Sequence, residues 1–292
     1  MISVVIISKD EPDLDETLND VAGQLAALTG DDEGEIVVVD ASDGRLDHIR
    51  RKHEDTVRWL DFQQPASVRV SIPHQRNTGV RAAKGDIIVF TDAGCRPLPG
   101  WLKHLVAPLR EGENCTAGAS QGLGGDQHYR HSPGQVGEVT YLREAPTLNL
   151  AFRRSAFDAV GDFDESFTYG SDVDFSWRLN DAGYRIRFVP DAVIEHDYGK
   201  PQRQRRRSYV YGKARARLYV KHRARRRYVL RDDPIVVVYP LFLLGLPLTL
   251  IFPPYPLLLL IPAWRNRDQG IAWVLVDHLW FGFGVLAELA GR

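Results

Sequence analysis

Three short apolar runs, separated by segments with helical spacing, most constrain the fold of this 292-residue chain. The runs are Ile2–Ser8, Glu35–Asp40 and Asp86–Thr91. Nearly continuous apolar sequence of this length is typical of strands that are buried on both faces. Between the runs, apolar residues recur at helical spacing over Asp13–Leu28, and Arg76–Lys84 is predicted to form another helix. This alternation predicts a doubly wound α/β sheet with parallel strands.

Polar residues follow these strands at the points where a ligand site is expected. In doubly wound sheets, ligands bind beyond the carboxyl ends of the strands. Asp40 ends the second run, Asp92 follows the third, and a charged segment follows Ser8. We therefore expect these residues to lie along one edge of the sheet and to form the binding site.

The next hundred residues contain further short elements. Gly118–Gly137 is rich in glycine and has little periodicity, so it is predicted to be mostly loop. Apolar runs and glycine stops then predict a strand, two helices and two short strands, at Thr147–Phe152, Arg154–Val160, Asp172–Ala182, Tyr184–Val189 and Ala192–Glu195.

Charge is unevenly distributed along the chain. The formal net charge is −1, yet residues 201–231 contain 13 basic side chains and no acidic ones. Tyr211, Ala214 and Leu218 recur there at helical spacing. A basic amphipathic helix is typical of an element that lies on a membrane surface, attracted to anionic headgroups. The alternative is a nucleic-acid-binding role for the same arginines, and the apolar sequence that follows argues against it.

Two apolar segments, 235–264 and 271–290, are predicted to be membrane segments. Ile235–Ile261 contains no charged residue, and about 20 apolar residues are enough to cross a bilayer. Its six prolines, counted to Pro262, make a re-entrant hairpin an alternative to one straight helix. The second segment contains Asp277, and an acid inside the bilayer is costly. The remaining alternative is a buried pair of helices in a soluble protein.

The ends of the chain and its cysteines exclude other classes of protein. Met1 leads directly into Ile2–Ser8 and then into charged residues, so no signal peptide is expected. The excess of Lys and Arg before the apolar segments predicts that the preceding domain lies on the cytoplasmic side of the cell membrane. Cys95 and Cys115 show no metal-binding spacing, which excludes a disulfide scaffold and a structural zinc site.

Long blocks of sequence between residues 2 and 199 carry a family resemblance. They read SVVIISKDEPD, EIVVVDASDG, HQRNTGVRAAKGDIIVFTDAGCRPLPGWL and NLAFRRSAFDAVGDFDESFTYGSDVDFSWRLNDAGYRIRFVPDAVIEHDYG. In order and spacing they resemble the inverting glycosyltransferases of family 2, which have the GT-A fold. The resemblance implies a Rossmann-like, doubly wound mixed sheet over residues 1–200, with a nucleotide half at about 1–115 and an acceptor half at about 116–200. The basic and apolar tail is similar to that of members that glycosylate lipid-linked acceptors.

The resemblance implies roles for three residues of the nucleotide half. Asp40 is expected to contact the nucleotide base, and Arg76 is expected to lie near the nucleotide. Asp92 matches the first acid of the Asp-x-Asp motif, which meets the ribose and the metal-bound diphosphate. The chain departs from that motif, because Gly94 stands at the second acid and Cys95 follows it. Cys95 is interpreted as a small packed residue and not as a metal ligand.

The resemblance also implies roles for two residues of the acceptor half. Asp172 keeps the position of the catalytic base, although Ser171 replaces the glutamate that usually precedes it. His196 matches the histidine that binds the metal or contacts the diphosphate. Asp92 and His196 are thus the expected ligands of Mg²⁺ or Mn²⁺. Without the resemblance, Asp40 would be interpreted as a turn-capping residue and Asp172 as a carboxylate at a helix start.

Together these observations predict a membrane-associated inverting glycosyltransferase. The expected donor is a nucleotide sugar linked to UDP or GDP, and the expected acceptor is a glycan on polyprenyl or dolichyl phosphate, used in surface glycan or glycoprotein assembly. The expected partners include the membrane and exclude nucleic acid. The alternatives are a catalytically inactive membrane scaffold of the same fold, a nucleotidyltransferase on a similar sheet, and a nucleic-acid-binding protein.

Overall fold

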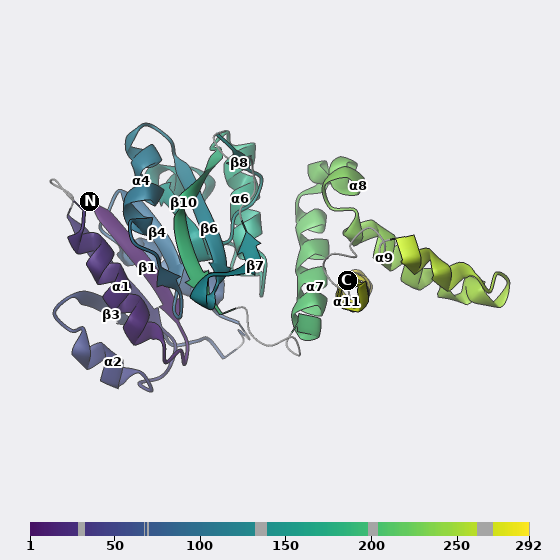
Figure 1. Cartoon of the computed structure of the whole chain (residues 1–292), viewed down its shortest axis with the longest axis horizontal. Coiled ribbons are helices and arrows are strands. Elements are labelled where there is room, and N and C mark those ends of the chain that lie inside the picture. Colours follow the sequence, from purple (N-terminus) through teal and green to yellow (C-terminus); the bar gives the residue numbers. More distant parts are fainter. Residues whose placement is uncertain are drawn as a thin grey trace. The chain divides into compact units, whose positions relative to one another are not determined.

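The computed structural model describes residues 1–28, 33–66, 68, 70–131, 139–197, 204–261 and 271–291. The chain divides into two compact units, Met1–Tyr198 and Gly199–Arg292. The first unit contains the sheet and the second is helical (Figure 1).

The nucleotide half of the first unit contains the parallel part of the sheet. Four neighbouring strands run in the order β3-β2-β1-β4, with bounds Val57–Asp61, Gly34–Asp40, Ile2–Ser8 and Ile87–Asp92. Each pair is parallel. The three predicted strands are therefore confirmed, and β3, which has the less regular pattern VRWLD, adds a strand at the end of this series.

The acceptor half makes the sheet mixed. β9 (Leu150–Arg153) lies antiparallel between β4 and β6 (Cys115–Gly122), and β10 (Ile186–His196) runs parallel to β6. Short strands complete it: β5 (Arg96–Pro97), β7 (Asp126–His131) and β8 (Tyr141–Leu142). The mixed sheet implied by the resemblance is confirmed, whereas the wholly parallel sheet predicted from periodicity is wrong beyond β4.

Helices cover both faces of this sheet, because alternate residues of each strand point to opposite sides. α1 (Leu14–Ala26) and α4 (Trp101–Arg110) pack on one side, in a core that includes Val4 and Ile6. On the other side, in a core that includes Val5, lie α3 (Ile72–Ala82), α5 (Arg154–Val160) and α6 (Ser171–Asp181). The short helix α2 (Asp47–Lys52) follows β2.

Two predictions for the acceptor half are wrong. The glycine-rich segment is not mostly loop, because most of β6 and all of strand β7 lie in it, while its residues 132–137 lie outside the described residues. Gly118 lies where a Cβ atom would collide with the carbonyl oxygen of Ala192 and the amide of Asn149, so the small residue serves close packing. The two short strands near the end form one strand, β10, with a register shift between Val189 and Val193.

Asn149, which is almost fully buried, joins elements of both halves. Its side-chain oxygen accepts a hydrogen bond of 2.8 Å from the indole of Trp101 on α4. Its amide nitrogen donates to the carbonyl oxygens of Ala119 on β6 and Ala192 on β10, at 2.7 and 2.9 Å. One side chain therefore satisfies polar groups from three elements.

The described residues of the second unit include the helices α7 (Gln204–Lys221), α8 (Val229–Asp232), α9 (Ile235–Leu244) and α11 (Ile271–Ala290), and 3-10 turns follow α7 and α9. α7 and α11 approach closely at two glycines. A Cβ atom at Gly212 would collide with the backbone of Phe281, and one at Gly284 with the backbone of Tyr209. The predicted basic helix is confirmed as α7, and the basic sequence continues into the 3-10 turn Arg223–Tyr228.

The predicted membrane segments are not confirmed as spans. Among the residues that the structure describes, no helix combines the length and the apolar character needed to cross a bilayer. Segment 235–264 is not one continuous helix, because α9 ends at Leu244 and the 3-10 turns Leu246–Leu250 and Tyr255–Leu259 follow. Its prolines remove backbone donors and clash with helical geometry. Residues 262–264 lie outside the described residues.

Candidate active site

The predicted site residues of the nucleotide half lie at one edge of the sheet. In the parallel register, Ser8 pairs with Asp40 and Ile7 with Asp92. The carboxyl ends of β1, β2 and β4 are therefore level with one another. This is the edge at which a doubly wound sheet binds ligands.

Asp40 is buried at the end of β2 and is fixed by its own turn. Its Oδ1 atom accepts hydrogen bonds from the backbone N–H and the hydroxyl of Ser42, at 3.2 and 2.5 Å. The Ser42 oxygen in turn accepts a 2.7 Å bond from the backbone N–H of Asp10. Burial raises the pKa of Asp40, and the Ser42 bonds oppose that rise. These hydrogen bonds connect the segment after β1 to the end of β2.

Asp92 lies among three other predicted site residues. Burial raises the pKa of Asp92, while the positive charges of Arg76 and His196 act to lower it and the charge of Asp172 acts to raise it. Each of these side chains is therefore close enough to act on the Asp92 carboxylate. The fold brings together residues from α3, β4, α6 and β10, whereas Asp40 interacts with Asp10 and Asp61 instead.

Arg76 reaches this cluster from the interior of a helix. α3 begins at Ile72, so the prediction that Arg76 opens the helix is wrong; Pro73, near its first turn, is compatible with a helix start. Arg76 is 7% exposed, and its Nη1 atom donates a 3.0 Å bond to the hydroxyl of Ser171. The guanidinium also lies over the ring of Phe163, 5.6 Å from its centre.

Asp172 and Asp174 have different surroundings although they are two residues apart. Asp174 is fully buried and forms a 2.9 Å ion pair with Arg178, one helical turn away. Asp172 is partly exposed, and its Oδ1 atom accepts a bond from the neighbouring backbone N–H of Val173. Asp174 therefore supports the helix, whereas Asp172 is partly exposed and its charge acts on Asp92.

The turn after Asp92 explains why the second acid is missing. The backbone N–H of Cys95 donates to the carbonyl oxygen of Asp92, and Gly94 between them has a φ of +85°. The hydroxyl of Thr17 on α1 accepts from the Gly94 N–H and donates to the Cys95 carbonyl oxygen. A Cβ atom at Gly94 would lie 3.3 Å from the carboxyl carbon of Glu11. Backbone conformation and crowding thus both favour glycine here.

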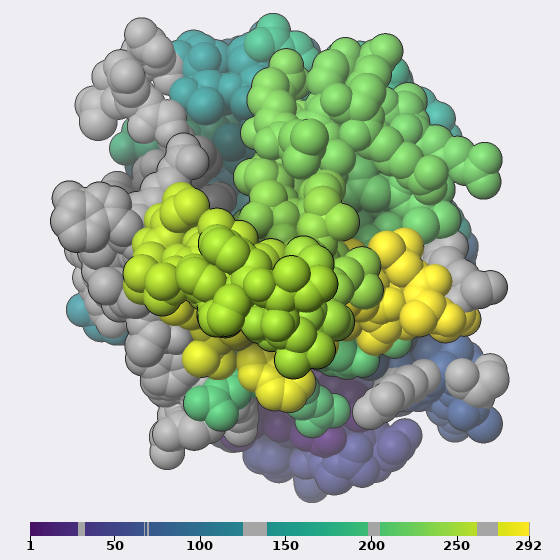
Figure 2. Space-filling model, turned by 90° about the vertical axis from the view of Figure 1, so that its right-hand side faces the viewer, coloured from purple at the N-terminus to yellow at the C-terminus, as the bar shows by residue number. Residues whose placement is uncertain are grey.

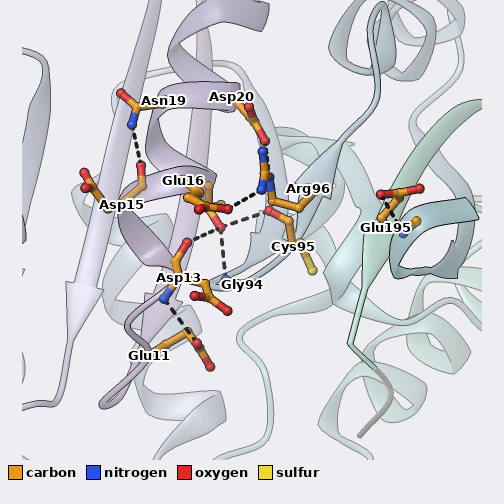
Figure 3. Close-up of polar contacts among 12 residues, drawn as sticks. Glu11, Asp13, Asp15, Glu16, Asn19, Asp20, Gly94, Cys95, Arg96 and Glu195 are labelled. Atoms are coloured by element: carbon orange, nitrogen blue, oxygen red, sulfur yellow. Dashed lines mark hydrogen bonds and ion pairs between the residues drawn. The ribbon is translucent and has the colours of Figure 1, made fainter.

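Acidic residues of α1 also hold the strand that follows this turn. Arg96 forms ion pairs with Glu16 and, at 2.6 Å, with Asp20 (Figure 3). Glu11 follows β1 at the edge where Asp40 and Asp92 lie, and its charge acts on Cys95. Glu11 belongs to the charged segment after Ser8 that was expected at this edge, but no individual role was predicted for it.

His196 ends β10 beside the same turn. Its Nδ1 atom lies 3.6 Å from the sulfur of Cys95. Cys95 is fully buried, and burial raises its thiol pKa to about 12. The thiol therefore stays protonated near neutral pH and packs as a small residue, as predicted. Among the described residues, no group of three or more His, Cys, Asp and Glu side chains is arranged to hold a metal ion.

Known proteins with similar sequences include glycosyltransferases. The pre-mycofactocin glycosyltransferase of Mycobacterium tuberculosis is 34% identical over 163 residues, which cover 50% of this chain and 34% of that protein. The succinoglycan biosynthesis protein ExoA of Rhizobium meliloti is 31% identical over 65% of this chain and 62% of its own length. Glycosyltransferase AglE of Haloferax volcanii is 26% identical over 67% and 66%. The chain thus spans about a third of the mycobacterial relative.

A solved structure shares the fold. The mannosyltransferase PcManGT of Pyrobaculum calidifontis, in complex with GDP-Man and Mn²⁺, aligns with 100% of this chain and 87% of its own, with a TM-score of 0.68 and 18% identity. The family model described as Glycosyl transferase family group 2 matches residues 120–285. The model described as Glycosyl transferase family 2 matches residues 3–168, more than half of the chain. The chain therefore belongs to glycosyl transferase family 2, a family of glycosyltransferases, as its sequence predicts.

Proposed function

We propose that this chain transfers a sugar from a UDP- or GDP-linked donor to a lipid-linked acceptor, with inversion at the anomeric carbon. One observation carries the proposal: the charges of Arg76, Asp172 and His196 all act on Asp92, which ends β4 at the ligand-binding edge of the sheet. A donor diphosphate needs positive charge, and an attacking hydroxyl needs a base. The cluster contains both kinds of group.

Asp172 is the proposed catalytic base. Its partly exposed carboxylate accepts the proton of the acceptor hydroxyl as the oxygen attacks the anomeric carbon of the sugar. The bond to the diphosphate breaks on the opposite face, so one displacement inverts the configuration. Arg76 stabilises the negative charge that develops on the leaving nucleoside diphosphate, and buried Asp40 contributes to binding of the base.

A divalent cation fits the carboxylate of Asp92 and the imidazole of His196, because Mg²⁺ prefers oxygen ligands and Mn²⁺ accepts both. When bound, the cation would neutralise diphosphate charge. Two protein ligands leave room in the coordination shell for phosphate oxygens. The Mn²⁺ in the complex of PcManGT with GDP-Man supports this assignment.

The helical unit is the proposed site of contact with a membrane and hence with the lipid-linked acceptor. The segment after α9 lies at the surface of the face shown in Figure 2, in yellow-green. Its large apolar side chains are exposed, including Leu250 at 87% and Ile251 at 85%. Exposed arginines, Arg223 and Arg226 among them, precede α9. An apolar surface together with a basic segment favours binding to the interface of an anionic bilayer. We accordingly propose that the chain works at the cytoplasmic face of the cell membrane.

The test is a panel of nucleotide sugars, each labelled in the sugar, incubated with membranes that contain the protein. Mass analysis of extracted lipids identifies the acceptor and the added sugar, and donor stereochemistry against product stereochemistry reports inversion. Membranes that contain the Asp172→Asn variant are the control. A labelled product that persists unchanged with this variant would contradict the assigned mechanism.

A catalytically inactive scaffold is the second candidate, favoured by Gly94 and Ser171 where the family has acids. It predicts nucleotide-sugar binding without turnover for every donor of the panel. Turnover of any donor, abolished by Asp172→Asn, would exclude it.

A further inference from the structure

Arg76 is a buried cation that forms no ion pair, although its charge acts on the buried carboxylate of Asp92. Its side chain is 7% exposed, and its Nε atom is buried and has no hydrogen-bond partner. Across the described part of the chain, no carboxylate lies within ion-pair distance of its guanidinium. A buried charge is costly unless it is paired. The position of Arg76 is therefore one that an anion would stabilise.

Ser171 is the residue that leaves Arg76 in this state. It is 2% exposed, it begins α6, and its hydroxyl accepts the single side-chain hydrogen bond of the guanidinium, at 3.0 Å. A hydroxyl orients the guanidinium without neutralising it. An acid at position 171 would instead form a charge-assisted pair with Arg76 and occupy the same donors.

The ring of Phe163 fixes the guanidinium from another side. It lies 5.6 Å from the Arg76 carbon, and the backbone around Phe163 is held by Asn77, which follows Arg76 on α3. Asn77 donates to the Phe163 carbonyl oxygen at 2.9 Å and accepts from its N–H at 2.9 Å. The planar cation is thus held before a ligand arrives, which reduces the entropy lost on binding.

We propose that Ser171 is a positioning residue that orients Arg76 without forming an ion pair with it, so that Arg76 forms a subsite for one phosphate group of the donor diphosphate. This inference rests on the proposed function, and it adds which side chain neutralises the negative charge of the diphosphate. The phosphate group takes the donors that an acid at 171 would otherwise occupy. Part of the diphosphate affinity then depends on Arg76 even when no divalent cation is present.

The matched pair Ser171→Asp and Ser171→Asn tests this, because the two replacements have the same shape and differ in charge. Calorimetry measures the affinity of the full chain for UDP, GDP and the two nucleosides, in a chelator and in Mn²⁺. In the chelator, Ser171→Asp is expected to weaken nucleoside diphosphate binding roughly 10- to 100-fold relative to Ser171→Asn. Nucleoside affinity is expected to stay the same in both variants.

Arg76→Gln adds a second test that introduces no new bulk or acid. It is expected to remove most of the difference in affinity between nucleoside diphosphate and nucleoside. Combined with Arg76→Gln, Ser171→Asp should have little further effect, since its action passes through Arg76. Thermal melts and circular dichroism establish that each variant is folded.

The outcomes separate the inference from the function on which it rests. Equal diphosphate affinity in Ser171→Asp and Ser171→Asn would overturn the inference while transfer by the parent protein stood. A full additional loss from Ser171→Asp in the Arg76→Gln background would also overturn it, because the acid would then repel the diphosphate directly. A parent protein that bound none of the nucleotides would instead overturn the proposed function.

Discussion

Apolar side chains have opposite surroundings in the two units of this chain. In the first unit Leu105 is fully buried between α4 and the sheet, whereas after α9 in the second unit Leu250 is 87% exposed. The first pattern is that of a domain folded in water. The second is unusual for a surface that meets only water, since soluble proteins rarely expose contiguous apolar patches. Similar residue types are thus packed in a core in one unit and exposed in the other, where we propose that a membrane covers them.

The largest expected effect distinguishes two acids of α6, the proposed base Asp172 and the structural residue Asp174. We expect Asp172→Asn to reduce transfer by about 10²- to 10⁴-fold, because the acceptor hydroxyl loses its base. Calorimetry should find nucleotide affinity nearly unchanged. Asp174→Asn is the matched control, since it breaks the buried pair with Arg178 and should lower the melting temperature while folded protein remains active. Turnover by Asp172→Asn within threefold of the parent would remove this residue from the mechanism.

The comparison of the two units is tested directly by one substitution in each. Leu105→Ala should destabilise the first unit by about 2–5 kcal/mol, because it leaves a cavity in the core. Leu250→Ala should change the free energy of unfolding by about 0.5 kcal/mol or less and should instead weaken sedimentation with anionic vesicles. Urea unfolding and vesicle co-sedimentation measure the two effects. Vesicle binding unaffected by Leu250→Ala would break the comparison.

Sedimentation with membranes tests the proposed apolar contact of the second unit in the whole protein. We expect the chain to sediment with membranes and to need detergent for release, because high salt and carbonate disrupt charge contacts and leave apolar contacts intact. Recovery of all the protein in the soluble fraction after a carbonate wash would identify Ile235–Ile261 as a surface that protein, and not lipid, covers.

Metal binding is expected to be linked to nucleotide binding. Asp92 and His196 alone provide a weak site, so the cation should bind poorly without the diphosphate. By linkage, Mn²⁺ or Mg²⁺ should tighten nucleotide binding by the same factor by which nucleotide tightens metal binding, roughly 5- to 150-fold. Calorimetric titrations in either order measure both factors. If a chelator changed neither nucleotide affinity nor transfer, His196 would be reassigned to direct contact with the diphosphate.

The smallest expected effect concerns the turn after Asp92. Gly94→Ala should cost about 1 kcal/mol, because a side chain is strained at a φ of +85°. Gly94→Asp should cost at least as much, since its carboxylate would lie against Glu11. Urea unfolding measures both. Stabilisation by Gly94→Asp would show that the crowding by Glu11 relaxes and that a second acid is compatible with this turn.

The sequence predicted those parts of the fold that depend on local patterns, such as a run of apolar residues. It did not predict contacts between residues that are distant along the chain. Ile2–Ser8 is buried on both faces, so its apolar run identified the strand to the residue. Gly118 was misinterpreted as part of a loop because its small size is required by Ala192 and Asn149, which are distant in sequence. The pairing of Arg76 with Ser171 joins residues 95 positions apart, and no local pattern indicates such a contact.

The hydrogen bonds of Asn149 have a consequence for how the first unit comes apart. If the nucleotide half separated from the acceptor half, the indole N–H of Trp101 would lose its partner, and strand β4 would lose its pairing with β9. If the acceptor half opened first, the carbonyl oxygens of Ala119 and Ala192 would lose their shared donor. Separation of the halves thus leaves buried polar groups without partners, and the unit is expected to unfold in one cooperative transition in which both halves lose structure at the same denaturant concentration.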